Sequence, residues 1–393
     1  MSGSLRFGVF LPPYHKFDID PTLAIHRDLE LIELWERLGF DEVWVGEHHS
    51  GGIELIASPE QFLAAAAMRT KRIRLGTGVV SLPYHHPFMV ASRIVLLDHL
   101  SHGRAMLGVG PGALPFDAAM FGIEQEQTRP RLEQSLEAII ALLRAEEPVS
   151  IETDWFKLDE AMLQLLPYQR QQLEIAVAAA VSPSGARLAG KFGCGLLCVS
   201  ATSEAGFKAL REHWEVAEEQ AALHATSVDR ASWRVVGPMH LAPTREQAQR
   251  EVEYGLMDWA LYFQEVGAVP QVQVDGASTA ELIEEINGNG LGVIGTPQDA
   301  IAQITRLYEQ SGGFGTYLLI GHDWADPEAT ARSYELFARL VAPEFRGSLD
   351  SLRRTRRRSS ERFQPLRAKQ AAAIESAKAR YESQRGARSS DRR

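Results

Sequence analysis

The chain has 393 residues, of which 45% are hydrophobic and 23% are charged, a composition that supports a large packed core and excludes global disorder. Its formal net charge of −10 is unevenly distributed. Residues 353–393 hold 14 Lys and Arg against 4 Asp and Glu, a balance of +10 that leaves −20 for the other 352 residues. An acidic body offers few of the clustered cations that phosphate contacts need, so we expect no nucleic-acid partner.

Two further absences narrow the class of protein. Only two cysteines are present, Cys194 and Cys198, which excludes a disulfide framework, and we expect both to lie in the core. No apolar run approaches the roughly 20 residues that span a bilayer, so we expect no membrane span. The first residues lack the long apolar region of a signal peptide. We therefore expect a cytoplasmic protein.

Short apolar runs alternate along the chain with longer amphipathic runs, which predicts strands and helices in turn. The candidate strands are residues 7–11, 42–45, 73–80, 105–109, 173–177, 196–199, 235–241 and 317–320. The clearest helices are residues 23–38, 59–69, 131–144, 203–223 and 296–310. Eight strands with intervening helices predict a (β/α)8 TIM barrel over residues 1–346, with an open doubly wound sheet as the alternative.

Three segments depart from this alternation. Residues 149–167 predict a small strand excursion, and the long, polar, Gly-rich segment 263–291 is a candidate active-site lid. Residues 347–393 form a basic C-terminal extension without a core-forming pattern, either disordered or partly helical near residues 366–381. We expect it to be a solvated extension. Docking to an acidic subunit or partner, and contact with nucleic acid or a membrane, are the alternatives.

In a TIM barrel the chemistry lies at the C-terminal ends of the strands. Glu47, His48 and His49 follow the second candidate strand, which raises the question of a metal. Ligands would have to be drawn from His48, from His85 or His86, and from Glu47 or Asp323. Adjacent histidines on a strand point to opposite faces, and the spacing of a strong zinc motif is absent. We therefore predict no metal site.

Other strand ends suggest a flat, phosphorylated ligand. Gly110 lies in a Gly-Val-Gly-Pro-Gly run after the fourth strand, whose spacing does not fit a dinucleotide fingerprint, although its glycines would let a flat ligand approach the backbone. Val181, Ser182 and Ser184 open a helix after the fifth strand, where hydroxyls and free N–H groups can hold a phosphate. Arg129 can supply the cation.

With these residues the sequence resembles the bacterial luciferase-like flavin monooxygenase family over roughly residues 6–345. The motifs that carry the resemblance are residues 39–41, 45–49, 74–80, 82–87, 97–104, 181–183 and 295–297. Residues 10–13, 47–52 and 108–115 are most similar to the limonene 1,2-monooxygenase-type members.

The resemblance implies a barrel that uses reduced FMN or FAD, supplied by a separate NAD(P)H flavin reductase, with O2 as cosubstrate through a C4a-peroxyflavin. It also implies that the protein assembles as a homodimer. It assigns His48 to proton exchange with Glu47 beside it, and Gly78 and Val79 to the flavin ring. The flavin phosphate would bind Arg129, Ser182 and the N–H of Val181.

Two departures from the family pattern affect the expected activity. Gly110-Pro111 stands where luciferases carry Cys-Arg, which argues against luciferase activity, and Gly185-Ala186 replaces hydroxyl residues in the phosphate turn. The acidic body favours a neutral apolar substrate, such as a monoterpene that is epoxidised or a cyclic ketone. An F420-dependent oxidoreductase and a non-catalytic flavin-binding subunit are the alternative functions.

Overall fold

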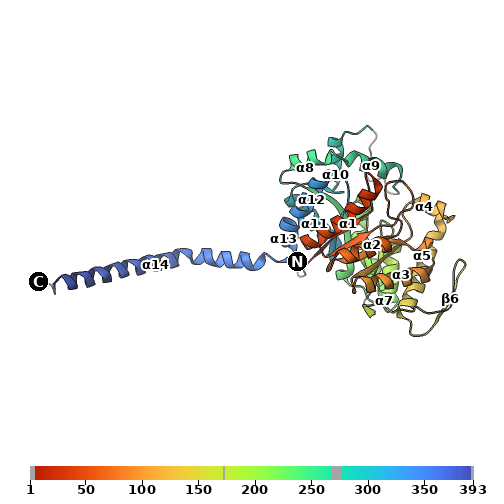
Figure 1. The fold of residues 1–393 in the computed structure, drawn as a ribbon, viewed down its shortest axis with the longest axis horizontal. Coiled ribbons are helices and arrows are strands. Elements are labelled where there is room, and N and C mark those ends of the chain that lie inside the picture. Colours follow the sequence, from red (N-terminus) through yellow and green to blue (C-terminus); the bar gives the residue numbers. More distant parts are fainter. Residues whose placement is uncertain (1–4, 171–172, 268–275, 391–393) are drawn as a thin grey trace. The chain divides into compact units, whose positions relative to one another are not determined.

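The computed structural model describes residues 5–170, 173–267 and 276–390. The chain divides into two compact units, Met1–Phe345 and Arg346–Arg393. The first contains a sheet of parallel strands with helices around it (Figure 1). The second consists mainly of one helix.

Eight parallel strands of the described residues form a closed barrel. Each pairs with the next, β10 pairs with both β9 and β12, and β12 pairs with β1, for example through Phe7 and Tyr317. The strands are β1 (Arg6–Leu11), β2 (Glu42–Val45), β3 (Arg74–Thr77), β5 (Ala105–Gly110), β8 (Glu174–Ala179), β9 (Gly195–Cys198), β10 (Trp233–Leu241) and β12 (Thr316–Ile320). Closure confirms the predicted TIM barrel and excludes the open sheet.

The helices that cover the barrel begin and end at residues with recognisable capping chemistry. The Asp20 side chain accepts a hydrogen bond from the N–H of Leu23 at the start of α1, and Gly39 ends α1 in the left-handed conformation. The helices of the first unit are α1 (Pro21–Leu38), α2 (Pro59–Arg69), α3 (Pro87–Leu100), α4 (Pro115–Met120), α5 (Gln125–Arg144), α6 (Ser184–Phe192), α7 (Glu204–Leu223), α8 (Arg245–Val252), α9 (Leu256–Glu265), α10 (Thr279–Asn289), α11 (Pro297–Ser311), α12 (Pro327–Leu336) and α13 (Ala342–Arg346).

Short additional strands modify the barrel at three places. The predicted strand 73–80 is interrupted, because Gly78 and Val79 separate β3 from the short β4 (Val80–Ser81), which pairs with β5. The β11 strand (Val293–Gly295) extends the edge of β10. The strand excursion predicted at residues 149–167 is present as an antiparallel hairpin of β6 (Val149–Glu152) and β7 (Lys157–Ala161).

The candidate lid at residues 263–291 lies partly outside the described residues, which omit 268–275. Its described part contains α10, where the sequence suggested only an irregular segment. The helix begins with a reciprocal capping box between Ser278 and Glu281, and its buried Leu282 and Ile286 pack into a second apolar core. The capping pair and the apolar spacing explain why the segment is helical despite its polar composition.

A small apolar cluster fills the barrel interior. It consists of Trp44, Met106, Ala176, Leu197, Val236 and Leu318. The Trp44 indole is so close to β3 that a Cβ at Gly76 would lie 2.6 Å from it. The barrel is therefore packed rather than hollow, and a ligand has to lie above this cluster, at the strand ends.

Below the cluster, a buried ion network joins the beginnings of four strands. The Arg234 guanidinium in β10 is fully buried and donates two hydrogen bonds to Glu42 of β2, at 3.1 and 2.9 Å. It also donates to Glu174 of β8, which in turn accepts from Arg74 of β3 at 2.8 Å. Burial would raise the pKa of Glu174, but the two arginines lower it to about 2. Burial would also raise the pKa of Glu42, but Arg234 lowers it, so both carboxylates of the network keep their charges.

The second unit contains α14 (Asp350–Ser390). The sequence predicted helix only near residues 366–381, or disorder, so the helix is much longer than predicted. Ala, Arg, Lys, Gln and Glu dominate the segment, and these residues have high helix propensity even without a core-facing pattern. No helix among the described residues is both long enough and apolar enough to cross a membrane.

We expect Arg234→Met to destabilise the barrel by about 3–5 kcal/mol, because the fully buried Glu42 carboxylate would lose its counter-ion. Urea unfolding followed by circular dichroism measures the loss. The double variant Arg234→Met/Glu42→Leu removes both charges and should be clearly more stable than the single variant. If the two variants were equally stable, the ion pair would not be the source of the effect.

Candidate active site

The loop after β2 carries several site residues at the C-terminal end of that strand. Glu47 follows the strand closely and is buried, whereas the neighbouring His48 side chain remains 14% exposed. The two side chains lie in different clusters, because adjacent residues of an extended segment point to opposite sides. The sequence predicted Glu47 and His48 as a catalytic pair, but the structure gives each its own partners.

His48 lies between two acidic side chains, Glu54 of the same loop and Asp117, which is 69 residues away in sequence. Its Nδ1 lies 3.3 Å from Asp117 Oδ2, and its Nε2 lies 3.4 Å from Glu54 Oε2. Asp117 comes from the first turn of α4 and also accepts hydrogen bonds from the His49 N–H and the Ser50 hydroxyl. These contacts fix the plane of the imidazole.

The two acids differ in their titration. Burial raises the pKa of Glu54, whose carboxyl also accepts the Tyr262 hydroxyl of α9. Burial would likewise raise the pKa of Asp117, but its contacts with His48, Ser50 and the His49 N–H lower it. Asp117 is therefore the carboxyl that stays ionised beside the histidine. Burial alone would lower the pKa of His48, yet the neighbouring acids outweigh it and raise that pKa.

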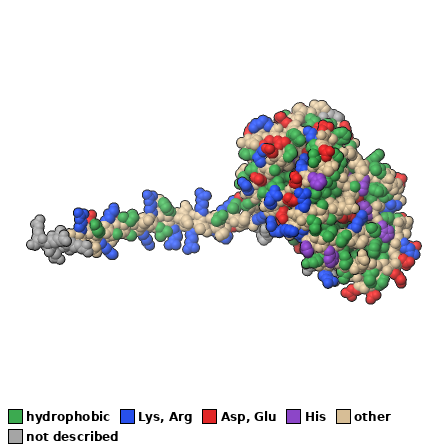
Figure 2. All heavy atoms as spheres, viewed as in Figure 1, with side chains coloured by type: hydrophobic (Ala, Val, Ile, Leu, Met, Phe, Trp, Pro, Cys, Tyr) green, Lys and Arg blue, Asp and Glu red, His purple; other side chains and the backbone are tan. Residues whose placement is uncertain are grey.

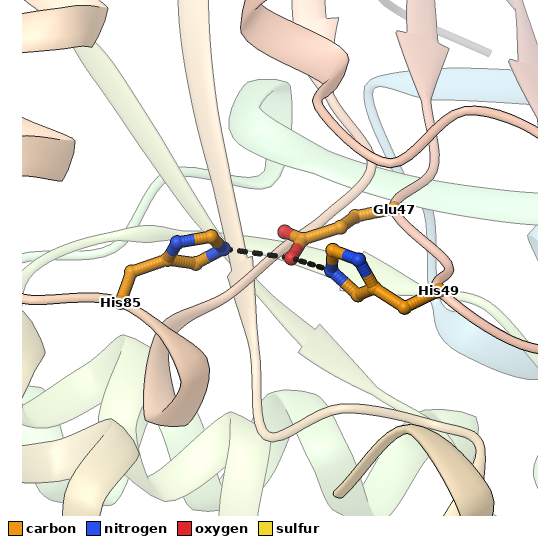
Figure 3. A group of neighbouring side chains, drawn as sticks. All are labelled: Glu47, His49 and His85. Carbon is orange, nitrogen blue, oxygen red and sulfur yellow. Dashed lines mark hydrogen bonds and ion pairs between the residues drawn. The ribbon is translucent and has the colours of Figure 1, made fainter. Parts of the chain in front are cut away.

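Glu47 forms the second cluster, with His49 and His85 (Figure 3). His49 Nε2 and His85 Nε2 both donate to Glu47 Oε1, at 2.8 and 2.7 Å, while the other carboxylate oxygen accepts the Ser81 N–H at 2.9 Å. Burial would raise the pKa of Glu47, but these hydrogen bonds lower it. The hydrogen bond to Glu47 raises the pKa of His49.

The same three side chains are the residues in the described part of the chain that could approach a metal ion together. Their ligand atoms lie within 4.8 Å of one another. This set differs from those considered from the sequence, because His48 faces the other cluster. His86 caps α3 through the Phe88 N–H, and Asp323 pairs with Arg27 at 2.8 Å.

The three residues predicted to bind the flavin ring, Gly78, Val79 and Gly110, lie close together beside the interior cluster. A Cβ at Gly78 would lie 2.9 Å from the Trp44 side chain, and one at Gly110 would lie 2.7 Å from the side chain of Val79. Val79 itself packs on the interior cluster. Packing against Trp44 and Val79 therefore requires glycine at both positions.

The predicted phosphate turn is exposed at the start of α6. Ser182 and Ser184 hydroxyls lie 2.9 Å apart, and Val181 is 48% exposed. Gly185 is required here by packing, because a Cβ would lie 2.1 Å from the Ala178 carbonyl oxygen of β8. The missing hydroxyl at this position thus has a structural cause.

Arg129 lies in the second turn of α5, rather than at its start, and its side chain is exposed. One turn later, Glu133 pairs with Lys191 at 2.9 Å and with Arg187, both in α6. Residues four apart share a helix face, so Arg129 lies on the face of α5 that meets α6. This places a cation on the side of the predicted phosphate turn.

Sequence reasoning missed Asp117 and Glu54. Asp117 had a local signal, since it follows Pro115 in a short helix directly after a barrel strand. Glu54 and its hydrogen-bond partner Tyr262 are 208 residues apart in sequence, and no pattern in the sequence links them.

Apolar side chains flank the His48 cluster on α4. Phe116 and Met120 are 65% and 58% exposed, and Phe121 stacks on Tyr84 with ring centroids 5.0 Å apart. Phe156 and Trp259 are both buried in apolar cores.

The comparisons with known proteins decide the family. The pattern that defines the luciferase-like monooxygenases matches residues 5–314. The chain belongs to the luciferase-like monooxygenase family. It is 50% identical over 351 residues to limonene 1,2-monooxygenase of Rhodococcus erythropolis, covering 88% of each chain. It is 47% identical over 350 residues to 4-hydroxyprotoasukamycin monooxygenase of Streptomyces nodosus subsp. asukaensis, covering 88% of this chain and 94% of that one.

A solved structure supports the same assignment. The oxygenating constituent of 3,6-diketocamphane monooxygenase from Pseudomonas putida, a type II Baeyer–Villiger monooxygenase in complex with FMN, superposes with a TM-score of 0.71 at 26% identity. The match covers 87% of this chain and 99% of that one. The protein is thus a flavin-dependent monooxygenase of this family.

We expect Asp117→Asn to lower the pKa of His48, because it removes the ionised partner that opposes desolvation. NMR titration of the His48 ring should show a lower midpoint than in the unchanged chain. The native shift stabilises the fold below about pH 6.5, and this contribution disappears as the pH rises through the folded-state pKa. Asp159→Asn, an exposed carboxyl of β7, is the matched control. An unchanged His48 midpoint in Asp117→Asn would contradict the assignment.

Proposed function

We propose that this monooxygenase takes reduced flavin from a separate NAD(P)H-dependent reductase and uses O2 to oxygenate a small, neutral, apolar molecule. The observation that carries the proposal is the position of His48. It is held between two carboxyls whose pKa values shift in opposite directions, and one of these carboxyls, Asp117, belongs to α4. A cytoplasmic homodimer, expected from the sequence, is part of the proposal.

The donor set at the start of α6 fits a flavin phosphate. Two hydroxyls, the first N–H groups of a helix and the exposed Arg129 are the groups that bind a phosphate dianion. Gly78, Val79 and Gly110 would face the isoalloxazine ring. The turn is open rather than enclosed, which suits a flavin that arrives reduced and leaves after turnover. When bound, reduced flavin supplies the two electrons that reduce one oxygen atom of O2 to water while the other enters the substrate.

His48 is suited to hold and return a proton at this place. Because the neighbouring acids raise its pKa against the effect of burial, His48 keeps its ring proton to higher pH and can donate it to an oxygen atom that gains negative charge. The Asp117 contact at Nδ1 fixes the ring orientation during the exchange. Glu47 is a positioning residue, because it is buried and holds His49 and His85.

The substrate class follows from the flanking surface. Phe116 and Met120 of α4 are exposed next to Asp117, and no cationic side chain belongs to the His48 cluster as the structure describes it. Limonene and diketocamphane occur in the names of similar proteins, and both are compact apolar molecules. Epoxidation of an alkene and oxygen insertion beside a ketone are the two outcomes that the proposal includes.

The direct test supplies the full chain with a general flavin reductase, NADH, FMN or FAD, and ¹⁸O2, together with a panel of monoterpenes and cyclic ketones. We expect one ¹⁸O atom in the organic product, detected by mass spectrometry. A parallel anaerobic reaction with reduced F420 tests the alternative oxidoreductase. Turnover only in that arm would reject the proposal, as would absence of labelled product with both flavins across the panel.

Two variants separate proton exchange from cofactor binding. His48→Asn should lower kcat by about 10²–10⁴-fold, the range for loss of a general acid, while leaving the Kd of reduced FMN nearly unchanged. Arg129→Ala should raise that Kd, measured anaerobically by fluorescence, by about tenfold or more. Arg131→Ala, another arginine of α5, is the control for a general loss of positive charge. Equal effects of Arg129→Ala and Arg131→Ala would remove Arg129 from the phosphate site.

A further inference from the structure

The C-terminal helix α14 carries features that the oxygenase chemistry does not use. It is 41 residues long, and every side chain of it that the structure describes is exposed. Five of these are large hydrophobic residues, namely Leu352, Phe363, Leu366, Ile374 and Tyr381, which are 50–67% exposed. An exposed hydrophobic set on a strongly basic helix requires an explanation.

The five hydrophobic side chains share one narrow face of α14. At about 100° of rotation per residue, they all fall within about 80° of arc around the helix. Phe363 and Tyr381 occupy nearly the same angular position, five turns apart. The stripe extends over residues 352–381, about 44 Å along the axis. A scattered arrangement would not place every large hydrophobic residue on one side.

Basic residues surround α14, including Arg354, Arg357 and Arg358 at about 120–160° from the centre of the stripe, and others border the stripe itself. Arg356, Arg367 and Lys378 lie along one of its margins, and Arg362 and Arg380 lie along the other. The three acidic residues inside the helix beyond its first turn are Glu361, Glu375 and Glu382, and all lie about 120–180° from the centre of the stripe. Figure 2 shows Lys and Arg side chains projecting from opposite sides of the described part of the helix. The side that presents hydrophobic groups is therefore positive, and the acidic groups face away.

This arrangement fits a planar, anionic and apolar boundary better than the other candidates. Phosphate contacts of nucleic acids depend on cations and make no use of a hydrophobic stripe. A coiled coil with a second α14 would need apolar residues about every 3.5 positions, whereas Leu352 and Phe363 have none between them that is large, and two such helices would repel. A bilayer surface with anionic lipids accepts both the stripe and its basic margins.

We propose that α14 binds peripherally to anionic lipid membranes, with the stripe Leu352–Tyr381 inserted at the level of the headgroups and the flanking Arg and Lys residues on lipid phosphates. The bound species is the bilayer surface. The proposal is independent of the substrate and of the flavin chemistry, because it concerns only the second unit.

The test is sedimentation of the full chain with vesicles of phosphatidylcholine alone or with about one third phosphatidylglycerol. We expect binding to the anionic vesicles to be at least about tenfold tighter and to weaken as salt rises from 0.1 to 0.5 M. Replacing Phe363, Leu366 and Ile374 by Ser should weaken it by about tenfold or more. The matched control replaces Ala368, Ala372 and Ala379 by Ser on the opposite face, which introduces the same number of serines and should retain binding.

Each other outcome overturns the proposal. Equal binding to both kinds of vesicle, or to neither, removes the anionic surface as ligand. An unchanged affinity of the Phe363/Leu366/Ile374 variant removes the stripe. Tighter binding to a DNA or RNA duplex than to anionic vesicles would assign α14 to nucleic acid. Concentration-dependent self-association that is lost in the stripe variant but not in the alanine control would assign the face to a second copy of the chain. Far-UV circular dichroism compares the helix content of the two triple variants.

Discussion

The barrel depends on a single buried cation. Arg234 lies below the interior cluster, where its guanidinium cannot reach water and stands over the Trp44 ring at 4.7 Å. It links the first residues of β2 and β8 to β10, and Glu174 extends the link to β3. Because Arg234 and Glu42 are both fully buried, removal of either one leaves the other without compensation. The network therefore fixes the relative heights of four strands at one end of the barrel.

This constraint reaches the active site through β2. Glu42 belongs to the ion network, and Glu47 follows the same strand five residues later, about 17 Å along its direction. Trp44 lies between them and fills the interior. The position of β2 along the barrel axis determines where Glu47 accepts hydrogen bonds from the Ser81 N–H and the two imidazoles. It also determines where His48 lies. The interior cluster thus separates the ion network at the start of β2 from the histidines that follow its end, and this one short strand positions both.

The two acids beside His48, Asp117 and Glu54, lie in different environments and therefore differ in protonation. Asp117 stays ionised because it accepts several hydrogen bonds, whereas burial keeps the proton of Glu54 to higher pH. Such separated pKa values are a frequent mark of acid–base sites. Since Glu54 also accepts the Tyr262 hydroxyl, α9 is tied to the protonation state of the histidine. Movement of α9 and titration of His48 should therefore be coupled in this protein.

The sequence predicted helices and strands better than it predicted contacts between side chains. All eight barrel strands could be found from apolar runs, and Gly39 correctly marked the end of α1, because periodicity and capping are local properties. The stretch 73–80 was predicted as one strand since nothing local revealed that Gly78 and Val79 leave the ladder. Arg234 lies next to a predicted strand and gave no sign that its charge would be buried. Its partners lie 192 and 60 residues away, and only the closed barrel brings them together.

The uneven charge of the chain has a physical consequence for its two units. An acidic barrel is repelled by an anionic surface, whereas a basic helix is attracted to one, and each force fades within about 8 Å at physiological salt. The two units therefore have opposite electrostatic tendencies toward such a surface. Under the proposals for the substrate and for α14, binding of the helix to a bilayer would bring the chain to the phase in which an apolar substrate concentrates, without any change to the catalytic residues. The difference in charge between the acidic barrel and the basic α14 gives one chain a unit that an anionic surface repels and a unit that it attracts.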